Sequence, residues 1–250
     1  GTCDRCGTQV EKKKIRQWVL AITKYADRLS ADVEDLDWPE GIKDMQRKWI
    51  GRSEGCEFEL KKAWDLTQSV RVYTTRLDTV FGMTYVVIAP DHKDILDFID
   101  QSQKDACEKY ILDAKNKSDL DRTGTKEKTW VFTWSYVINP FNNEEVPLYI
   151  GDYVLGNYGT WAVMAVPAHD ERDFEFAKKM GIEIQEVISG GTEVPYTQDG
   201  ILIHSSEFNG LTSQEAREKL IKYAQAKWFG MKKVNYKLRD WLFSRQRYWG

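Results

Sequence analysis

Six short runs of β-branched and aromatic residues, bounded by Gly, Pro or Asn, dominate the chain between residues 56 and 167. They read CEFEL, SVRVYTT, TYVVIAP, TWVFTWSYVI, VPLYIGDYVL and TWAVMAVP. Runs of this length and composition between turn residues predict β-strands.

Elsewhere apolar residues recur every three to four positions, which predicts helices. One stripe, formed by Trp18, Ile22, Tyr25 and Leu29, indicates a helix over residues 16–31. The segment KDMQRKWIG indicates a second, short helix that stops at Gly51.

Three more helices are expected further along the chain. One spans roughly residues 92–115, and one starts near Asp170 and ends at Gly181. The third covers LTSQEAREKLIKYAQAK, with Thr212 as its N-cap and Glu215 completing a capping box. Many strands with few helices favour an α+β domain over about 52–234, with a curved or barrel-like sheet. Both ends of the chain resemble parts of something else.

Composition places the chain among ordinary globular proteins, with 250 residues, 42% hydrophobic and 30% charged. We expect no transmembrane helix, because no run of 18 apolar residues occurs, and no signal peptide at the start. A cytoplasmic location is the default. The net charge of −3 gives no overall attraction to nucleic acid. Two basic segments with interleaved aromatics, VEKKKIRQW and MKKVNYKLRDWLFSRQRYWG, fit a local RNA contact or a solvated face equally well.

Cys3 and Cys6 form a C-x-x-C turn. A tetrahedral zinc site needs four ligands, and no second pair follows nearby, so the turn fits half of a zinc knuckle whose other ligands lie outside this chain. A redox role is less favoured, because no thioredoxin-like βαβ unit surrounds the turn. Cys56 and Cys107 lie in strand and helix patterns and are expected in the core.

The segment YTTRLDT gathers Thr74, Thr75, Arg76, Asp78 and Thr79 at the end of a strand. It fits a simple strand end with an Asp turn. It also fits a ligand that carries phosphate, because hydroxyl donors with one cation are suited to phosphate.

In VPAHDERDFEFA, Asp170 and Asp173 stand at a helix start. Capping and the helix dipole explain both carboxylates. A functional alternative is equally compatible: Asp173 faces the strand ends and binds an ammonium group. The three histidines, His92, His169 and His204, lie in unrelated contexts, so chemistry without a metal cofactor or a protein nucleophile is expected.

Several motifs together resemble leucyl-tRNA synthetases of the bacterial type. They are MQRKWIGRSEG, YTTRLDTVFGMTYVVIAPDH, AVMAVPAHDERDFEFAKKMGI, SSEFNGL and VNYKLRDWLFSRQRYWG. No HIGH-type or KMSKS-type signature occurs. The resemblance implies a mostly antiparallel editing domain with peripheral helices over 52–234. It also implies a partial zinc knuckle over 1–14, a helical stem over 15–51, and a return strand into the catalytic body over 235–250.

The resemblance also implies roles for single residues. Thr79 matches the threonine that excludes leucine, and Asp173 matches the aspartate that pairs with the substrate's α-ammonium. Arg76 matches an arginine near the terminal phosphate of tRNA, and Thr74 and Thr75 match hydroxyls that line the site. Further substrate-binding positions are implied at Asp78, Tyr158, Met164, Val166, His169 and Asp170.

The activity implied is proofreading: hydrolysis of tRNA(Leu) that carries norvaline, isoleucine or methionine. A pocket separates side chains that differ by one methylene by only about 1–3 kcal/mol, so a second, hydrolytic site adds the lacking discrimination. The implied partners are the tRNA(Leu) 3′ end and the rest of the synthetase, with no membrane. The synthetase body would use ATP and Mg²⁺ to attach leucine.

The chain departs from the family pattern at several tryptophans. Trp161 falls on the last glycine of a Gly-Thr-Gly turn, and Trp130, Trp134 and Trp228 also fall where glycine is usual. Gly and Trp share neither volume nor backbone freedom. One interpretation is that UGA codons decoded as glycine have been translated as Trp; the other is genuine, repacked tryptophans. Leu77 stands where proline is frequent, with little effect expected.

Two other functions remain open. A free-standing deacylase is disfavoured by the segment KLRDWLFSRQRYWG, which matches a return into a catalytic body. A non-catalytic RNA-binding or zinc module is disfavoured because Thr79 and Asp173 are both present.

Overall fold

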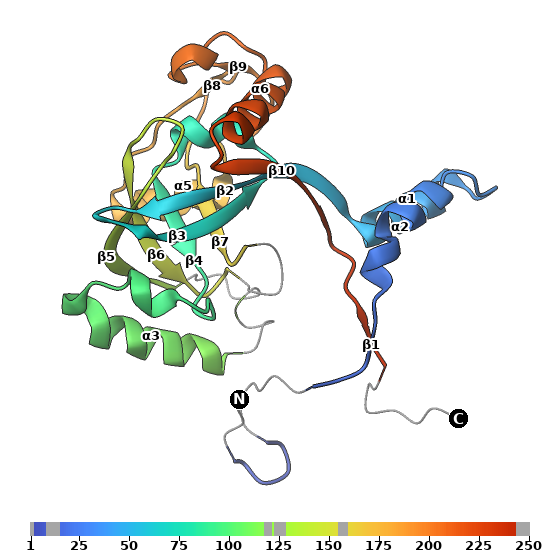
Figure 1. Cartoon of the computed structure of the whole chain (residues 1–250), viewed down its shortest axis with the longest axis horizontal. Coiled ribbons are helices and arrows are strands. Elements are labelled where there is room, and N and C mark those ends of the chain that lie inside the picture. Colours follow the sequence, from blue (N-terminus) through green and yellow to red (C-terminus); the bar gives the residue numbers. More distant parts are fainter. Residues whose placement is uncertain (1–2, 9–15, 118–121, 123–128, 155–159, 244–250) are drawn as a thin grey trace. The chain divides into compact units, whose positions relative to one another are not determined.

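The computed structural model describes residues 3–8, 16–117, 122, 129–154 and 160–243 (Figure 1). The chain divides into two compact units. The first unit combines Gly1–Val10 with Gly55–Lys232, and the second combines Glu11–Glu54 with Lys233–Gly250. The domain limits expected from the sequence stay a prediction.

A seven-stranded sheet forms the centre of the first unit. Its strands are β2 (Arg52–Lys62), β3 (Asp65–Thr74), β4 (Tyr85–Ile88), β5 (Trp130–Ile138), β6 (Glu145–Gly151), β7 (Ala162–Ala165) and β10 (Gly230–Tyr236). They follow the order β10-β2-β5-β6-β4-β7, and β3 pairs with β2. All six apolar runs of the sequence therefore form strands, and the α+β class is confirmed.

The sheet is mostly antiparallel, as expected. β2 runs antiparallel to β3 and β5, β5 to β6, and β4 to β7, whereas β4 and β6 are parallel. β3 also packs against β7, the last strand of the path. Closure into a barrel stays a prediction.

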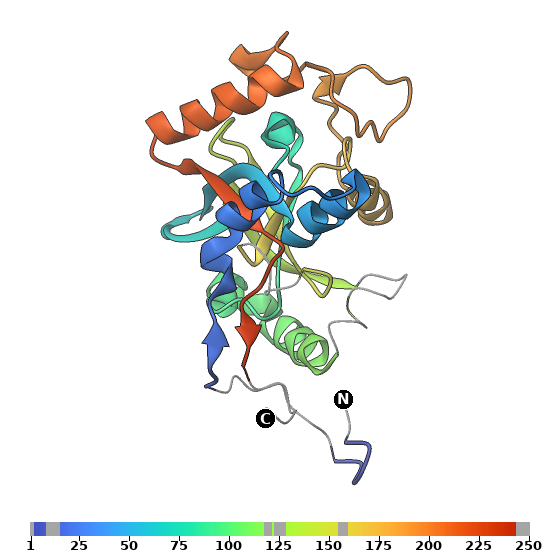
Figure 2. The ribbon, with the colours of Figure 1, turned by 90° about the vertical axis from the view of Figure 1, so that its right-hand side faces the viewer.

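Helices cover the sheet on several sides (Figures 1 and 2). The α-helices are α3 (Lys104–Asn116), α5 (Glu171–Met180) and α6 (Ser213–Ala226), and the 3₁₀ turns are η2 (Leu77–Gly82), η3 (Ile95–Phe98), η4 (Gln101–Gln103) and η5 (Ser206–Phe208). A small ladder pairs β8 (Ile188–Ser189) with β9 (Ile201–Leu202). Helix α3 packs on β5, and α6 packs on η2.

The helix limits follow from local signals. The Asp170 side chain caps α5 and Gly181 ends it in the left-handed conformation. Thr212 and Glu215 form the expected capping box of α6. By contrast, the helix expected over 92–115 starts only at Lys104. The Asp100 side chain accepts a hydrogen bond from the Ser102 amide, and the Asp100 amide donates to the Thr133 carbonyl. These two hydrogen bonds hold the stretch before Lys104 in short turns.

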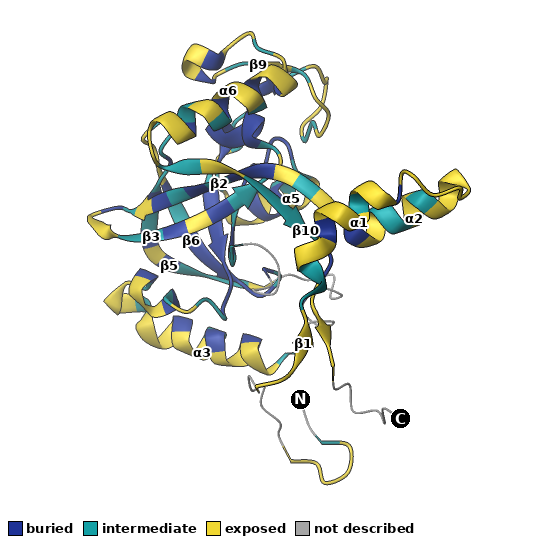
Figure 3. Cartoon of the chain, turned by 45° about the vertical axis from the view of Figure 1, so that its right-hand side comes forward, coloured by how far each residue is buried: buried dark blue, intermediate teal, exposed yellow. Residues whose placement is uncertain are grey.

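The core lies mainly between the sheet, η2 and α6, and a smaller cluster lies under α5. Strands β4, β6 and β7 are largely buried. The helices keep exposed outer faces (Figure 3). Cys56 and Cys107 are buried, as expected, and burial raises the pKa of both thiols to about 11. Within the described residues, no helix has both the length and the apolar character needed to cross a bilayer.

The second unit contains β1 (Val19–Leu20), η1 (Ile22–Tyr25), α1 (Ala26–Asp32), α2 (Glu40–Ile50) and β11 (Trp241–Leu242). Helix α2 ends at Gly51, as expected. A single helix over 16–31 is wrong for its first half. Val19 and Leu20 pair instead with Leu242 and Trp241, a contact between distant parts of the chain that helical periodicity cannot reveal.

Candidate functional site

The segment after β3 folds into a tight turn that leads into η2. The Thr74 hydroxyl accepts the Arg76 amide at 2.9 Å. The Thr79 hydroxyl and amide both donate to the Arg76 carbonyl, at 2.8 and 3.1 Å. Thr79 is 1% exposed, so its rotamer is fixed by packing and by this hydrogen bond. Thr75, in contrast, is exposed.

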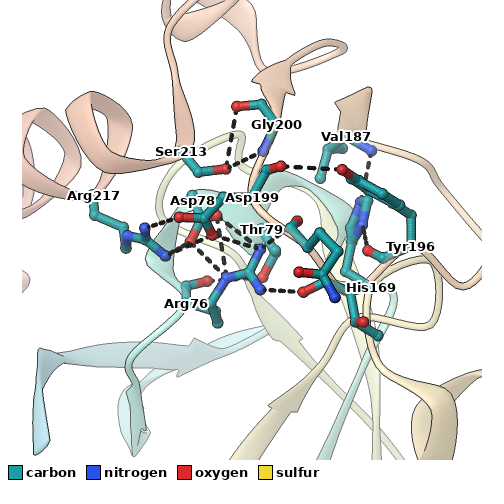
Figure 4. Close-up of polar contacts among 12 residues, drawn as sticks. Arg76, Asp78, Thr79, His169, Val187, Tyr196, Asp199, Gly200, Ser213 and Arg217 are labelled. Carbon is teal, nitrogen blue, oxygen red and sulfur yellow. Dashed lines mark hydrogen bonds and ion pairs between the residues drawn. The ribbon is translucent and has the colours of Figure 1, made fainter. Parts of the chain in front are cut away.

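Two arginines surround the buried carboxylate of Asp78 (Figure 4). The Arg76 guanidinium donates to both Asp78 oxygens at 3.1–3.2 Å, and Arg217 of α6 lies 3.6 Å from the same carboxylate. Arg217 also pairs with Asp199 at 2.5 Å. Arg76 donates to the Thr197 carbonyl at 2.8 Å. The guanidinium of Arg76 is therefore held by Asp78 in its own turn and by the carbonyls of Thr197 and Gln198, which lie 121 and 122 residues later in the chain.

Loss of the Asp78 carboxylate should destabilise the protein strongly. In Asp78→Ala, two partly buried arginines lose a shared partner, and we expect the free energy of unfolding to fall by about 3 kcal/mol. Urea denaturation measures this change. The matched control is Glu218→Ala on the exposed face of α6, which should change stability by less than about 0.5 kcal/mol. Equal midpoints for the two variants would contradict the role of Asp78.

Asp173 lies in the first turn of α5, at the end of β7. One carboxylate oxygen accepts the Val166 amide at 2.9 Å, and the other lies 3.8 Å from Arg172. The Asp173 amide donates to Asp170, which also caps the helix. Asp173 is only 5% exposed. Burial, followed by repulsion from Asp170, raises its pKa to about 7.

The raised pKa of Asp173 makes stability depend on pH. The folded protein favours the protonated form, so the stability contributed by this group is complete below about pH 4 and is lost as pH rises to about 7. Asp173→Asn imitates the protonated form. At pH 8 it should be more stable than the unaltered chain, by up to about 4 kcal/mol, and at pH 4 the two should be equal.

Urea unfolding at the two pH values tests this expectation. Glu175→Gln, on the exposed face of the same helix, is the control and should show no pH-dependent difference. A difference for Asp173→Asn that is the same at both pH values would rule out a raised pKa.

His169 connects the two groups of residues. Its Nδ1 donates to the Tyr196 carbonyl at 2.9 Å, and its Nε2 accepts the Val187 amide at 3.0 Å. Burial lowers its pKa, which keeps the ring neutral. The His169 amide bonds the Val166 carbonyl. His169 thus positions the segment that holds Arg76 relative to the end of β7; a direct contact with substrate stays a prediction.

The remaining expected site residues are distributed as follows. Met164 is buried in β7 and Val166 directly after it, while Asp170 is partly exposed at the helix start. Tyr158 lies outside the described residues. Sequence reasoning missed Arg217 and Asp199. They carry no local signal, because a charged residue on a polar helix face is normally solvated.

Cys3 and Cys6 lie in a turn closed by the Gly7 amide on the Cys3 carbonyl, at 2.8 Å. Hydrogen bonds with Thr8 lower the pKa of the Cys6 thiol. In the described part of the chain, no three His, Cys, Asp or Glu side chains come together in a way that could hold a metal ion. A zinc site at this turn stays a prediction, because a tetrahedral site would need two ligands beyond Cys3 and Cys6.

Comparison with known proteins shows the family to which the chain belongs. The family model described as the leucyl-tRNA synthetase editing domain matches residues 47–225. The chain belongs to the leucyl-tRNA synthetase family. The matched residues include both the Arg76–Asp78 cluster and Asp173, so the two groups of polar residues fall within the editing domain of this family.

Similar proteins of known sequence and structure support the same family assignment. A leucine–tRNA ligase of Clostridium tetani is 51% identical, and one of Clostridium botulinum is 52% identical, each over 100% of the chain. The chain spans about a third of their length, 31% in both cases. A crystal structure of the Agrobacterium radiobacter K84 LeuRS–tRNA–LeuAMS ternary complex matches with a TM-score of 0.77 and 36% identity, over 100% of this chain and 29% of that one.

Proposed function

We propose that this chain is the proofreading part of a leucine–tRNA ligase and hydrolyses misacylated tRNA(Leu). The observation that carries the proposal is Asp173, a buried carboxylate at the end of a sheet strand whose pKa is raised to about 7. A buried charge of this kind needs a partner. Arg172 lies 3.8 Å away on the other oxygen, and its side chain is 58% exposed, so it compensates the charge weakly.

The α-ammonium of an aminoacyl ester is suited to complete this site. An ammonium group beside Asp173 would favour the ionised carboxylate and form a charge-assisted hydrogen bond in a poorly hydrated place. Such a contact fixes the amino acid by a group that all amino acids share. Selection among amino acids must then come from the side-chain pocket.

Thr79 is proposed to form the wall that excludes leucine. Its side chain is branched at Cβ, buried, and fixed by the hydrogen bond to the Arg76 carbonyl. The side chains of norvaline, isoleucine and methionine differ from that of leucine only in their branching or in a single group. A fixed wall can exclude one shape, whereas an attractive pocket distinguishes such side chains by only about 1–3 kcal/mol.

The reaction is attack of a positioned water on the ester that joins the amino acid to the terminal ribose. In this proposal Thr74 and Thr75 orient the water or the ester, and no side chain forms a covalent intermediate. Arg76 contacts the terminal phosphate of tRNA. Its side chain remains 29% exposed while Asp78 holds the guanidinium, which leaves a fixed cation for that contact.

The longer protein that would contain this chain is proposed to attach leucine to tRNA(Leu). That reaction would use ATP and Mg²⁺ and would take place in parts of the protein other than this chain. Its partners are then tRNA(Leu), whose 3′ end carries the wrong amino acid, and the rest of the same chain, in the cytoplasm. Zinc at Cys3 and Cys6 would require two further ligands from that remainder.

A deacylation assay tests the function. Norvalyl-tRNA(Leu) and leucyl-tRNA(Leu) are incubated with the protein, purified with the sequence that flanks this chain in its gene. We expect the norvalyl ester to be hydrolysed at least about 10-fold faster than the leucyl ester. Equal enzymatic rates for the two esters would contradict the proposed proofreading, and no enzymatic hydrolysis of either ester would support the non-catalytic RNA-binding alternative.

A further inference from the structure

Four tryptophans have a backbone conformation that tryptophan rarely adopts. Among the described residues, seven other than glycine have positive φ: Trp64, Trp134, Asn143, Trp161, His204, Ser206 and Trp228. Asn and His are among the residue types enriched in this left-handed region, whereas a bulky residue there is an outlier. Trp accounts for only 10 of the 250 residues of the chain, so its presence at four of the seven positions needs an explanation.

Trp228 shows most clearly what the backbone requires. It follows α6 with φ 63°, its amide donates to the Gln225 carbonyl at 3.1 Å, and the Phe229 amide donates to the Ala224 carbonyl at 3.2 Å. These two bonds define a Schellman motif, in which the left-handed position is usually glycine. Gly51 and Gly181 occupy the corresponding positions of α2 and α5, with φ of 60° and 66°. The chain itself therefore uses glycine where this geometry recurs.

Trp64 and Trp134 stand at two further glycine positions. Trp64, with φ 65°, is the second residue of the two-residue turn between β2 and β3. Trp134, with φ 59°, lies in β5 where the register with β6 shifts between Phe132 and Tyr136. Tight hairpin turns and β-bulges both use glycine where φ is positive.

Trp161, with φ 64°, is the residue that leads into β7. Its carbonyl accepts the Ala89 amide at 2.8 Å, which fixes the start of the pairing between β7 and β4. The other end of β7 leads to Val166, whose amide binds Asp173. The conformation of this turn therefore contributes to the placement of the candidate site.

Burial of the indoles does not explain the conformations of Trp64, Trp134 and Trp228. The exposed fractions are 78% for Trp64, 58% for Trp134 and 93% for Trp228. Trp130 is different, because its backbone lies within a strand without positive φ and its indole packs on Phe176 and Lys179. The backbone conformation therefore favours glycine at positions 64, 134, 161 and 228, but not at position 130.

We propose that the cell that makes this protein places glycine at positions 64, 134, 161 and 228, by decoding UGA codons with a tRNA charged with glycine. UGA differs from the tryptophan codon UGG only in its third base, and from the glycine codon GGA only in its first. A translation that reads UGA as Trp would therefore write Trp at each of these positions. The four unrelated motifs then share one cause, and the turn before β7 carries no indole.

Peptide mass spectrometry of the protein from its own cells tests the proposal, together with the coding DNA. We expect UGA at the four positions and UGG for Trp18, Trp38 and Trp49. The tryptic peptides 63–71 and 228–232 should have masses that correspond to glycine at 64 and 228. The peptide 17–24, which contains Trp18, is the internal control and should retain tryptophan. Tryptophan in the first two peptides, or UGG codons there, would overturn the proposal.

Matched variants test the backbone argument in a host with the standard code. Trp64→Gly, Trp134→Gly, Trp161→Gly and Trp228→Gly together should raise the urea midpoint of the protein. The corresponding four changes at Trp18, Trp38, Trp49 and Trp241, which have no positive φ, should not raise it. A lower midpoint for the first set than for the printed sequence would also overturn the proposal.

Discussion

Asp173→Ala is expected to reduce kcat/KM for hydrolysis of norvalyl-tRNA(Leu) by about 100-fold or more. A hydrogen bond to a charged group contributes about 1.5–3 kcal/mol, which corresponds to about 10- to 150-fold. Misplacement of the ester relative to water adds to this loss. The carboxylate is in a suitable position for such a contact, because the Val166 amide fixes one of its oxygens at 2.9 Å at the end of β7.

The pH dependence separates a binding role from a merely structural one. Because the pKa of Asp173 is about 7 in the free protein, kcat/KM for deacylation should rise with pH through this value as the carboxylate ionises. Asp173→Asn keeps an acceptor for the Val166 amide but cannot ionise. It should lose activity without losing stability, and its activity should no longer rise in this pH range.

Glu175→Ala is the matched control, because Glu175 lies on the exposed face of the same helix. It should leave deacylation unchanged. Retention of full activity by Asp173→Ala, or an unaltered pH profile for Asp173→Asn, would remove Asp173 from the site.

Local parts of this fold could be predicted from the sequence. Thr212 and Glu215 form the expected capping box, and Gly181 ends α5, because caps depend on residues within one turn of each other. The strand runs were also recognisable, since their β-branched residues stand between turn residues. The position of Asp173 at the first turn of α5 follows from these signals alone.

Contacts between distant segments could not be predicted in this way. Arg217 reaches Asp78 from a helix 139 residues later in the chain, and nothing in its own segment distinguishes it from a solvated arginine. For the same reason the pairing of Val19 with Leu242 replaced the helix that periodicity indicated. The resemblance to a family predicts Thr79 and Asp173 as site residues, but only the structure shows that His169 connects the segments around them.

Thr79→Ala is expected to let the protein hydrolyse leucyl-tRNA(Leu), with a rate increase of about 10- to 100-fold for this correct ester. The change removes both the hydroxyl and the methyl group from a side chain that is 1% exposed, and it leaves room where the branched leucine side chain was excluded. Hydrolysis of norvalyl-tRNA(Leu) should continue, because Asp173 is unchanged. Deacylation of the two esters, measured side by side, gives the ratio directly.

Two further variants separate the methyl group of Thr79 from its hydroxyl. Thr79→Ser keeps the hydrogen bond to the Arg76 carbonyl but removes the methyl, and it should behave like Thr79→Ala. Thr79→Val keeps the branched shape and loses the hydroxyl, so it should continue to protect leucyl-tRNA(Leu). Protection in Thr79→Ser with loss in Thr79→Val would assign the exclusion to the hydroxyl and its hydrogen bond. Protection in all three variants would show that Thr79 is not the wall, and that leucine is excluded elsewhere in the site.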